Sequence, residues 1–147
     1  MFKKLLVAYD NEKQSLNALN FAIDIAKDAN AEIIIVTAIK VPDTYMLNLS
    51  FGNDANKLDT ADKNNQTYHT EKLEKAADTV KAEGIAVQFA LLTGNPGEAI
   101  VDYATNENID LIVLGSNNHG IIKKAVLGSV SSYVVNHSAC AVTIVKG

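Results

Sequence analysis

The 147-residue chain contains no arginine, and all 13 of its basic residues are lysines. Bidentate arginine clamps on phosphate, and arginine fingers supplied from within the chain, are therefore excluded. An anion site in this protein must depend on backbone N–H groups, hydroxyls and lysine side chains.

Cysteine and long apolar runs are also scarce. The single cysteine, Cys140, excludes an internal disulfide and fits a reducing compartment. No apolar run approaches the ~20 residues that span a bilayer, and the start of the chain does not resemble a signal peptide. The net charge of −4 is spread along the chain and gives no basic surface for nucleic acid or membranes. We therefore expect a cytoplasmic protein that binds neither.

What the sequence does contain is an alternation of strand and helix patterns. Apolar, β-branched runs predict strands, and apolar residues three and four positions apart predict helices. The predicted strands are 4–9, 32–39, 85–92, 109–114 and 141–145, and the predicted helices are 11–29, 63–83, 96–106 and 129–137. The stretch 40–61 is predicted to be an irregular surface loop with a helical turn near 45–49. The whole predicts a single α/β domain over residues 1–147, with an open five-stranded parallel sheet and helices on both faces.

Two of the predicted helices have recognisable starts. Asn11 is expected to cap the first helix, with Gln14 completing a capping box. Asn95, Pro96 and Glu98 give a stronger signal for the third helix, because proline is favoured at the first helical position.

The connection from the fourth strand to the last helix is the clearest sign of function. The strand runs into Gly115 and Ser116, and Gly128 and Ser129 precede the helix about a dozen residues later. Strand-to-helix connections in α/β units usually take only about 2–6 residues. Glycines let backbone N–H groups turn toward an anion, and a helix N-terminus adds partial positive charge. The loop is therefore predicted to cradle a phosphate.

Common phosphate motifs and related folds do not fit this loop. Gly115 and Gly120 have P-loop spacing, but Ile121 and Ile122 stand where lysine and a hydroxyl residue must follow. A GxGxxG motif is absent. The third strand ends at Leu92 without the acceptor aspartate of a receiver domain, and the turn after the first strand lacks a flavodoxin-type phosphate loop.

The same loop resembles the nucleotide-binding signature of universal stress proteins. That signature is Gly-x-x-Gly, nine residues and then Gly-Ser/Thr, and the run from Gly115 to Ser129 resembles it in spacing, with Asn118 at the position of the second glycine. Three further parts of the chain also resemble this family. They are Leu6 to Asp10 with Ser15 and Ala18, then Gly94, Pro96 and Ile100, and finally Cys140 to Val145. The resemblance therefore covers almost the whole chain. The resemblance implies a Rossmann-like sheet with strand order 3-2-1-4-5.

The resemblance also implies an ATP site. Asp10 would lie near the ribose or the adenine, main-chain atoms at the end of the second strand would meet the base, and the loop would wrap the phosphates. Magnesium would be held mainly by the phosphates and water. The site residues implied in this way are Ala8, Tyr9, Asp10, Ala38, Ile39, Leu114, Gly115, Ser116, Asn118, Gly128, Ser129, Val130 and Ser131.

Asn118 departs from the family pattern, which has glycine at this position. Asparagine is the side chain that best tolerates the left-handed backbone conformation, so the path of the loop can be retained. Its side chain also adds bulk beside a phosphate. Both consequences stay open at this point.

The remaining candidate residues have simpler explanations. His69 and His137 have no partner at metal-ligand spacing, and His119 is expected to be a solvated loop residue. Cys140 precedes a strand and is expected to be buried and inert. Asp10 could serve only as a cap of the first helix.

The composition of the loop favours nucleotide binding over hydrolysis. Efficient hydrolysis needs a positioned water and charge stabilisation at the γ-phosphate, and the chain offers no arginine and no P-loop lysine. We expect a regulatory module that binds ATP with little or no turnover. A slow ATPase or phosphotransferase assisted by Asp10 or His119 is one alternative, and a nucleotide-free assembly subunit is another.

The last strand is expected to mediate assembly. The segment Val142 to Val145 is short, apolar and predicted to lie at a sheet edge, where unpaired backbone groups invite another strand. The family resemblance implies that it pairs with its copy in a homodimer.

Overall fold

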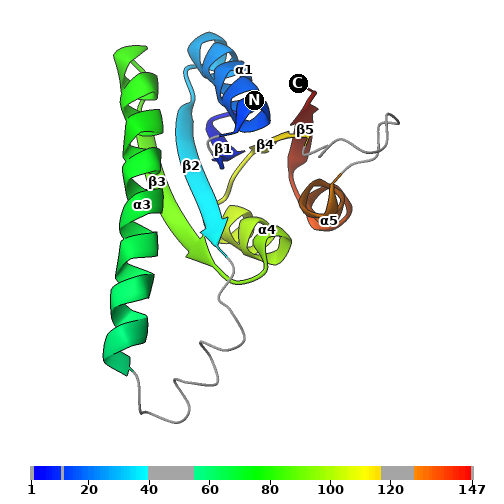
Figure 1. Ribbon diagram of the computed structural model, residues 1–147. Coiled ribbons are helices and arrows are strands. Elements are labelled where there is room, and N and C mark those ends of the chain that lie inside the picture. The colour runs from blue at the N-terminus through cyan, green and yellow to red at the C-terminus, as the bar shows by residue number, and fades with distance from the viewer. Residues whose placement is uncertain (1, 11, 40–54, 117–127, 147) are drawn as a thin grey trace.

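A parallel sheet with helices on both faces forms the centre of the protein (Figure 1). The computed structural model describes residues 2–10, 12–39, 55–116 and 128–146. The strands are β1 (Lys4–Ala8), β2 (Glu32–Ile39), β3 (Val87–Thr93), β4 (Leu111–Gly115) and β5 (Ala141–Val145), and the described helices are α1 (Lys13–Ala29), α3 (Ala55–Ala82), α4 (Pro96–Asn106) and α5 (Ser129–His137). The strand order is β3-β2-β1-β4-β5, and all neighbouring strands are parallel. The predicted fold and strand order are confirmed.

Each central strand supplies alternate side chains to two separate cores. Leu5 and Val7 of β1 pack in the core under α1 and α3, whereas Leu6 packs in the core under α4 and α5. All three side chains are fully buried. Burial of one large aliphatic side chain contributes about 1.5–3 kcal/mol, so the continuous apolar runs of the sequence are the main source of stability for a sheet covered on both faces.

The direction in which strands are added to the sheet reverses between β1 and β4, although these two strands are paired. After β1 the chain adds β2 and β3 on one side, and then crosses over to add β4 and β5 on the other. The connections that leave the carboxyl ends of β1 and β4 therefore run to opposite faces. Ligands of open α/β sheets bind at such a topological switch point.

The start of α4 is formed as predicted. Asn95 is the N-cap, its Oδ1 accepts the N–H of Glu98 at 3.4 Å, and Pro96 stands at the first helical position. The next residue, Gly97, lies directly against Tyr133 of α5, where a Cβ would be only 2.8 Å from the aromatic ring. The two helices therefore pack closely on one face of the sheet.

The start of α1 differs from the prediction. The helix begins at Lys13 with Glu12 at the N-cap, and no side chain caps it there. Asn11, the predicted cap, lies outside the described residues. The carboxylate of Asp10 takes over part of this role, because its Oδ1 accepts the N–H of Glu12 at 2.9 Å.

The start of α3 also differs. The helix begins at Ala55, so the predicted loop is wrong for residues 55–61, while residues 40–54 and the turn expected near 45–49 lie outside the described residues. Many polar residues favoured a loop here, but no glycine or proline occurs between residues 53 and 83 to interrupt a helix. The helix ends at Ala82, one residue before the predicted end, and Gly84, whose φ is +78°, follows it. No described helix is long and apolar enough to cross a membrane.

The ends of three strands shift by one or two residues. The first strand ends at Ala8, the third begins at Val87 and the fourth covers Leu111–Gly115. The fourth begins late because the N–H of Ile109 still bonds to the carbonyl of Ala104 in α4, at 2.9 Å.

Asp110 holds the amino-terminal segment against the sheet. Its Oδ2 accepts the N–H groups of Lys3 at 2.9 Å and Lys4 at 3.0 Å. These two backbone hydrogen bonds lower the pKa of the Asp110 carboxyl below its ordinary value. Because the pKa is lower in the folded state than in the unfolded state, the carboxylate stabilises the fold at neutral pH. That contribution is lost as the pH falls through the folded-state pKa.

Replacing Asp110 should destabilise the protein in a pH-dependent way. We expect Asp110→Ala to lower the free energy of unfolding at pH 7 by about 1–2 kcal/mol, because two backbone N–H groups lose a charged acceptor. The difference from the wild type should be smaller at pH 3, and denaturant unfolding at both pH values measures it. Asp102→Ala, on the exposed face of α4, is the control and should change stability by less than about 0.5 kcal/mol. An equal loss at both pH values would contradict the role of the charge.

Candidate functional site

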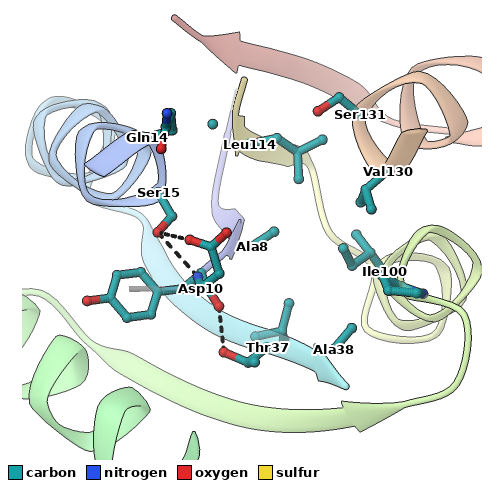
Figure 2. Close-up of a pocket in the computed structure, with 14 residues that line it drawn as sticks. Ala8, Asp10, Gln14, Ser15, Thr37, Ala38, Ile100, Leu114, Val130 and Ser131 are labelled. Carbon is teal, nitrogen blue, oxygen red and sulfur yellow. Dashed lines mark hydrogen bonds between the residues drawn. The ribbon is translucent and has the colours of Figure 1, made fainter. Parts of the chain in front are cut away.

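A cavity of about 210 Å³ lies at the switch point, between the carboxyl ends of β1 and β4 (Figure 2). It is bordered by strand ends and by the first turns of α1, α4 and α5. The lining residues are Ala8, Tyr9, Asp10, Gln14, Ser15, Val36, Thr37, Ala38, Pro96, Ile100, Leu114, Gly115, Val130 and Ser131. Typical small-molecule pockets measure about 300–1,000 Å³, so these residues would enclose only part of a large ligand.

The structure brings most of the predicted site residues together. Those that line the cavity are Ala8, Tyr9, Asp10, Ala38, Leu114, Gly115, Val130 and Ser131. Ile39, Ser116, Gly128 and Ser129 are described but do not line it. The carbonyl of Ile39 accepts the N–H of Gly94, and the N–H of Ser116 donates to the carbonyl of Val145, both at 3.0 Å. Asn118 and His119 lie outside the described residues.

Six lining residues were not among the predicted site residues. They are Gln14, Ser15, Val36, Thr37, Pro96 and Ile100. Ser15, Pro96 and Ile100 belong to the segments that resemble the family, but their patterns also had helix-forming explanations. Thr37 was the clearest missed signal, because it is a hydroxyl residue within an apolar strand.

The carboxylate of Asp10 has a fixed orientation at one side of the cavity. Its Oδ1 accepts the hydroxyl of Ser15 at 2.7 Å and the N–H of Glu12 at 2.9 Å. The N–H of Asp10 in turn donates to Ser15 Oγ at 3.2 Å. Ser15 belongs to the first turn of α1 and is buried, so the helix sets the position of the carboxylate.

The residue before it anchors the end of β1. The N–H of Tyr9 donates to the carbonyl of Val36 at 2.8 Å, and the carbonyl of Tyr9 accepts the buried hydroxyl of Thr37 at 2.6 Å. The Tyr9 side chain is 6% exposed, and burial, followed by the charge of Asp10, raises the pKa of its phenol. Tyr9 is therefore neutral at physiological pH. Its main-chain hydrogen bonds to β2 fix the position of the backbone just before Asp10.

The opposite side of the cavity is apolar. Figure 2 shows Ile100 of α4 and Val130 of α5 facing the side of the cavity formed by Ala8, with Leu114 above it. The cavity thus has a carboxylate on one side and aliphatic side chains on the other. Such a surface suits a flat, weakly polar ring joined to groups that donate hydrogen bonds.

The N-terminus of α5 adds a third kind of surface. Val130 and Ser131, in its first turn, line the cavity, and the N-cap residue is Gly128, which has no side chain that could cap the helix. The first N–H groups of a helix have no partners within it and carry partial positive charge. This end of the cavity is therefore suited to an anion.

Gly115 brings β4 into direct contact with α1. A Cβ at this position would lie 2.5 Å from both the carbonyl carbon and the carbonyl oxygen of Gln14. Any side chain would therefore displace the backbone of α1 next to Ser15. Glycine is required here by packing between two elements of the cavity wall, in addition to any role in contacting a ligand.

The two described histidines, His69 and His137, and the cysteine do not line this cavity. His137 stacks on Tyr133 with ring centroids 3.9 Å apart, and His69 contacts Tyr68 edge-on. The described residues contain no group of three or more metal-ligating side chains. Cys140 is only partly buried, contrary to the prediction, because it precedes an edge strand; its Sγ lies 3.3 Å from Ser138 Oγ.

Comparison with known proteins gives a consistent result over the whole chain. The profile of the universal stress protein family matches residues 1–146. A universal stress protein of Thermus aquaticus is 33% identical over 153 residues, which cover 99% of this chain and 100% of the relative.

Solved structures agree in fold. The protein MJ0577 of Methanocaldococcus jannaschii superimposes with a TM-score of 0.83 and 24% identity, covering 100% of this chain and 97% of that one. The structure of a universal stress protein in complex with cAMP superimposes with a TM-score of 0.67 and 28% identity. The match covers 98% of this chain and 96% of that protein's chain.

Substitution of Gly115 should test how the cavity is built. We expect Gly115→Ala to lower the free energy of unfolding by about 1–3 kcal/mol, because the added methyl group forces the first turn of α1 away from β4. Thermal or denaturant unfolding measures the loss. Combining it with Gln14→Ala should not restore stability, because the three nearest atoms are the carbonyl carbon, the carbonyl oxygen and Cβ of Gln14, and alanine keeps all three. Restoration by Gln14→Ala would show that side-chain atoms beyond Cβ, and not the backbone, cause the conflict.

Proposed function

The chain belongs to the universal stress protein family, and from this premise we propose that its cavity binds an adenine nucleotide, with ATP as the ligand. The observation that supports the proposal most directly is the meeting of three surfaces at the switch point: an apolar wall, a fixed carboxylate and a helix N-terminus that begins at a glycine. The cAMP complex of a 28% identical relative supports an adenine nucleotide in the same fold.

Each part of the nucleotide has a suitable surface. The adenine would lie against the aliphatic wall near Ile100 and Val130, and the phosphates would meet the N-terminus of α5 and the hydroxyl of Ser131. Gly115 and the loop that contains Asn118 would complete the phosphate site. Magnesium would be coordinated by the phosphates and water, since Mg²⁺ commonly keeps several water ligands.

We propose a regulatory module of the cytoplasm with little or no ATP turnover. Transfer of the γ-phosphoryl group needs charge stabilisation of the transition state and a positioned nucleophile. The chain contains no arginine to supply the first. A site of backbone amides and hydroxyls is better suited to holding a nucleotide than to cleaving it.

Binding can be tested with a pair of variants on one helix. We expect the wild type to bind ATP in calorimetric titration, and Val130→Asp to weaken binding at least about tenfold, because the new carboxylate repels the phosphates and disrupts the apolar wall. Helix α5 should tolerate the change, since acidic residues stabilise the first turn of a helix. Val135→Asp is the control, because Val135 is 45% exposed on the same helix and does not line the cavity. Absence of wild-type binding at millimolar ATP would refute the proposal.

We also propose that β5 pairs with its copy in a homodimer. β5 is an edge strand without a charged residue, and it is partly exposed along its length. Edge strands of this kind are open to pairing with another strand. Light scattering at tens of micromolar should give the mass of a dimer, and Thr143→Lys should shift the protein toward monomer, because a lysine on an edge opposes pairing. A monomeric wild type would contradict the dimer.

A further inference from the structure

The side chain of Gln14 lines the cavity without a hydrogen-bond partner in the described protein. Gln14 is the second residue of α1, and it is partly buried. Within the part of the chain that the structure describes, its side-chain amide makes no hydrogen bond, whereas the hydroxyl of the neighbouring Ser15 is held by Asp10. Most polar side-chain groups that are removed from bulk solvent have a partner, and a primary amide offers two donors and an acceptor. A ligand in the cavity is a suitable partner for this amide.

The root of the Gln14 side chain is held against the end of β4. Gly115, the last residue of that strand, has no side chain, and a Cβ at this position would lie 2.9 Å from Cβ of Gln14. The close approach of the two elements therefore sets where the side chain of Gln14 begins. A group held at its root loses less conformational freedom when it binds a ligand.

Ser131 lies across the end of β4 from Gln14. α1 packs in the core on one face of the sheet and α5 in the core on the other, and both residues line the cavity. Figure 2 shows Gln14 and Ser131 on either side of Leu114, near the end of β4. A group seated at the N-terminus of α5 would therefore have the Ser131 hydroxyl on one side and the Gln14 amide on the other.

Gln14 also carries the only side-chain N–H groups among the described residues that line the cavity. No lysine is among them, and the hydroxyls of Ser15 and Thr37 already donate to Asp10 and to the carbonyl of Tyr9. Phosphate oxygens are strong acceptors for such N–H groups, whereas the carboxylate of Asp10 repels an anion. The lining therefore directs the phosphate end of a nucleotide toward Gln14 and away from Asp10.

From these observations we propose that Gln14 is a specificity-determining residue, whose amide NH₂ donates a hydrogen bond to a phosphate group of the bound nucleotide. The inference rests on the proposed nucleotide site and adds to it a side chain from α1 that helps the site to prefer a nucleotide over a nucleoside. A neutral amide takes the place that a lysine or an arginine occupies in many phosphate sites.

The isosteric variant Gln14→Glu provides the sharpest test. The full-length protein is titrated with ATP by calorimetry and with adenosine by NMR chemical shifts, at pH 8. We expect Gln14→Glu to weaken ATP binding at least about twentyfold, because the carboxylate has no N–H to donate and repels the phosphate. The dissociation constant of adenosine, which has no phosphate, should change by less than about twofold.

The matched control is Asn20→Asp, which makes the same exchange of amide for carboxylate on the same helix. Asn20 is exposed and does not line the cavity, and it lies about 9 Å further along the helix axis. This variant should change ATP binding by less than about twofold. The fold should tolerate Gln14→Glu, because acidic residues stabilise the first turn of a helix and α1 has none there. Thermal unfolding without ligand should therefore give a midpoint near that of the wild type.

Gln14→Ala tests the hydrogen bond without a new charge. We expect ATP binding to weaken about fivefold, as for the loss of one hydrogen bond. Phosphorus NMR of bound ATP should show at least one phosphate resonance displaced from its wild-type position, while the H2 and H8 proton resonances of the adenine stay in place.

The outcomes separate this inference from the proposed site. If the wild type binds ATP and neither substitution of Gln14 weakens it, the inference is wrong and the nucleotide site stands. Equal weakening of adenosine and ATP, or displaced adenine resonances with unchanged phosphorus resonances, would place Gln14 on the nucleoside and overturn the inference. An equal loss in Asn20→Asp would assign the effect to long-range charge and also overturn it. If the wild type binds no nucleotide, the proposed function itself fails.

Discussion

The central position of β1 is the constraint on which the other features depend. Its side chains are buried in two cores, one under α1 and α3 and the other under α4 and α5. A strand covered on both faces can only be a continuous apolar run, and its neighbours must be added on both sides. The first polar side chain after such a strand lies at the carboxyl end of the sheet, beside the topological switch point. Asp10 is that residue.

The composition of the chain explains the chemistry of the cavity. With no arginine, the protein offers an anion only point-charged lysines, hydroxyls and backbone dipoles. The described lining of the cavity contains no lysine, and its one ionisable carboxylate belongs to Asp10. The cavity therefore places negative charge on the side of β1 and the partial positive charge of α5 on the other side. This polarity gives an asymmetric ligand a single favourable direction.

The sequence predicted the fold more completely than the site. Strands such as 32–39 could be assigned because burial on both faces leaves an unmistakable apolar run. The start of α3 could not, because Asn, Asp and Lys are compatible with both loop and helix and no apolar periodicity decides between them. At the site, Asp10 and Gly115 could be found by their positions at strand ends. Two contacts could not be predicted: the hydrogen bond between Asp10 and Ser15, and the packing of Gly115 against Gln14. Both depend on how α1 packs against β4, and the residue pattern of a single segment does not reveal this packing.

The contact at Gly115 links features that look separate in the sequence. It fixes the first turn of α1 against β4, and the same turn carries Ser15, which orients Asp10. On the other side, the contact between Gly97 and Tyr133 fixes α4 to α5, and these helices supply the apolar wall and the helix N-terminus. The cavity is thus bordered by α1, which packs against β4 on one face of the sheet, and by α4 and α5, which pack against each other on the other face. The proposed nucleotide would touch both, so its binding would stabilise the folded state by mass action, by an amount set by its free concentration relative to its Kd.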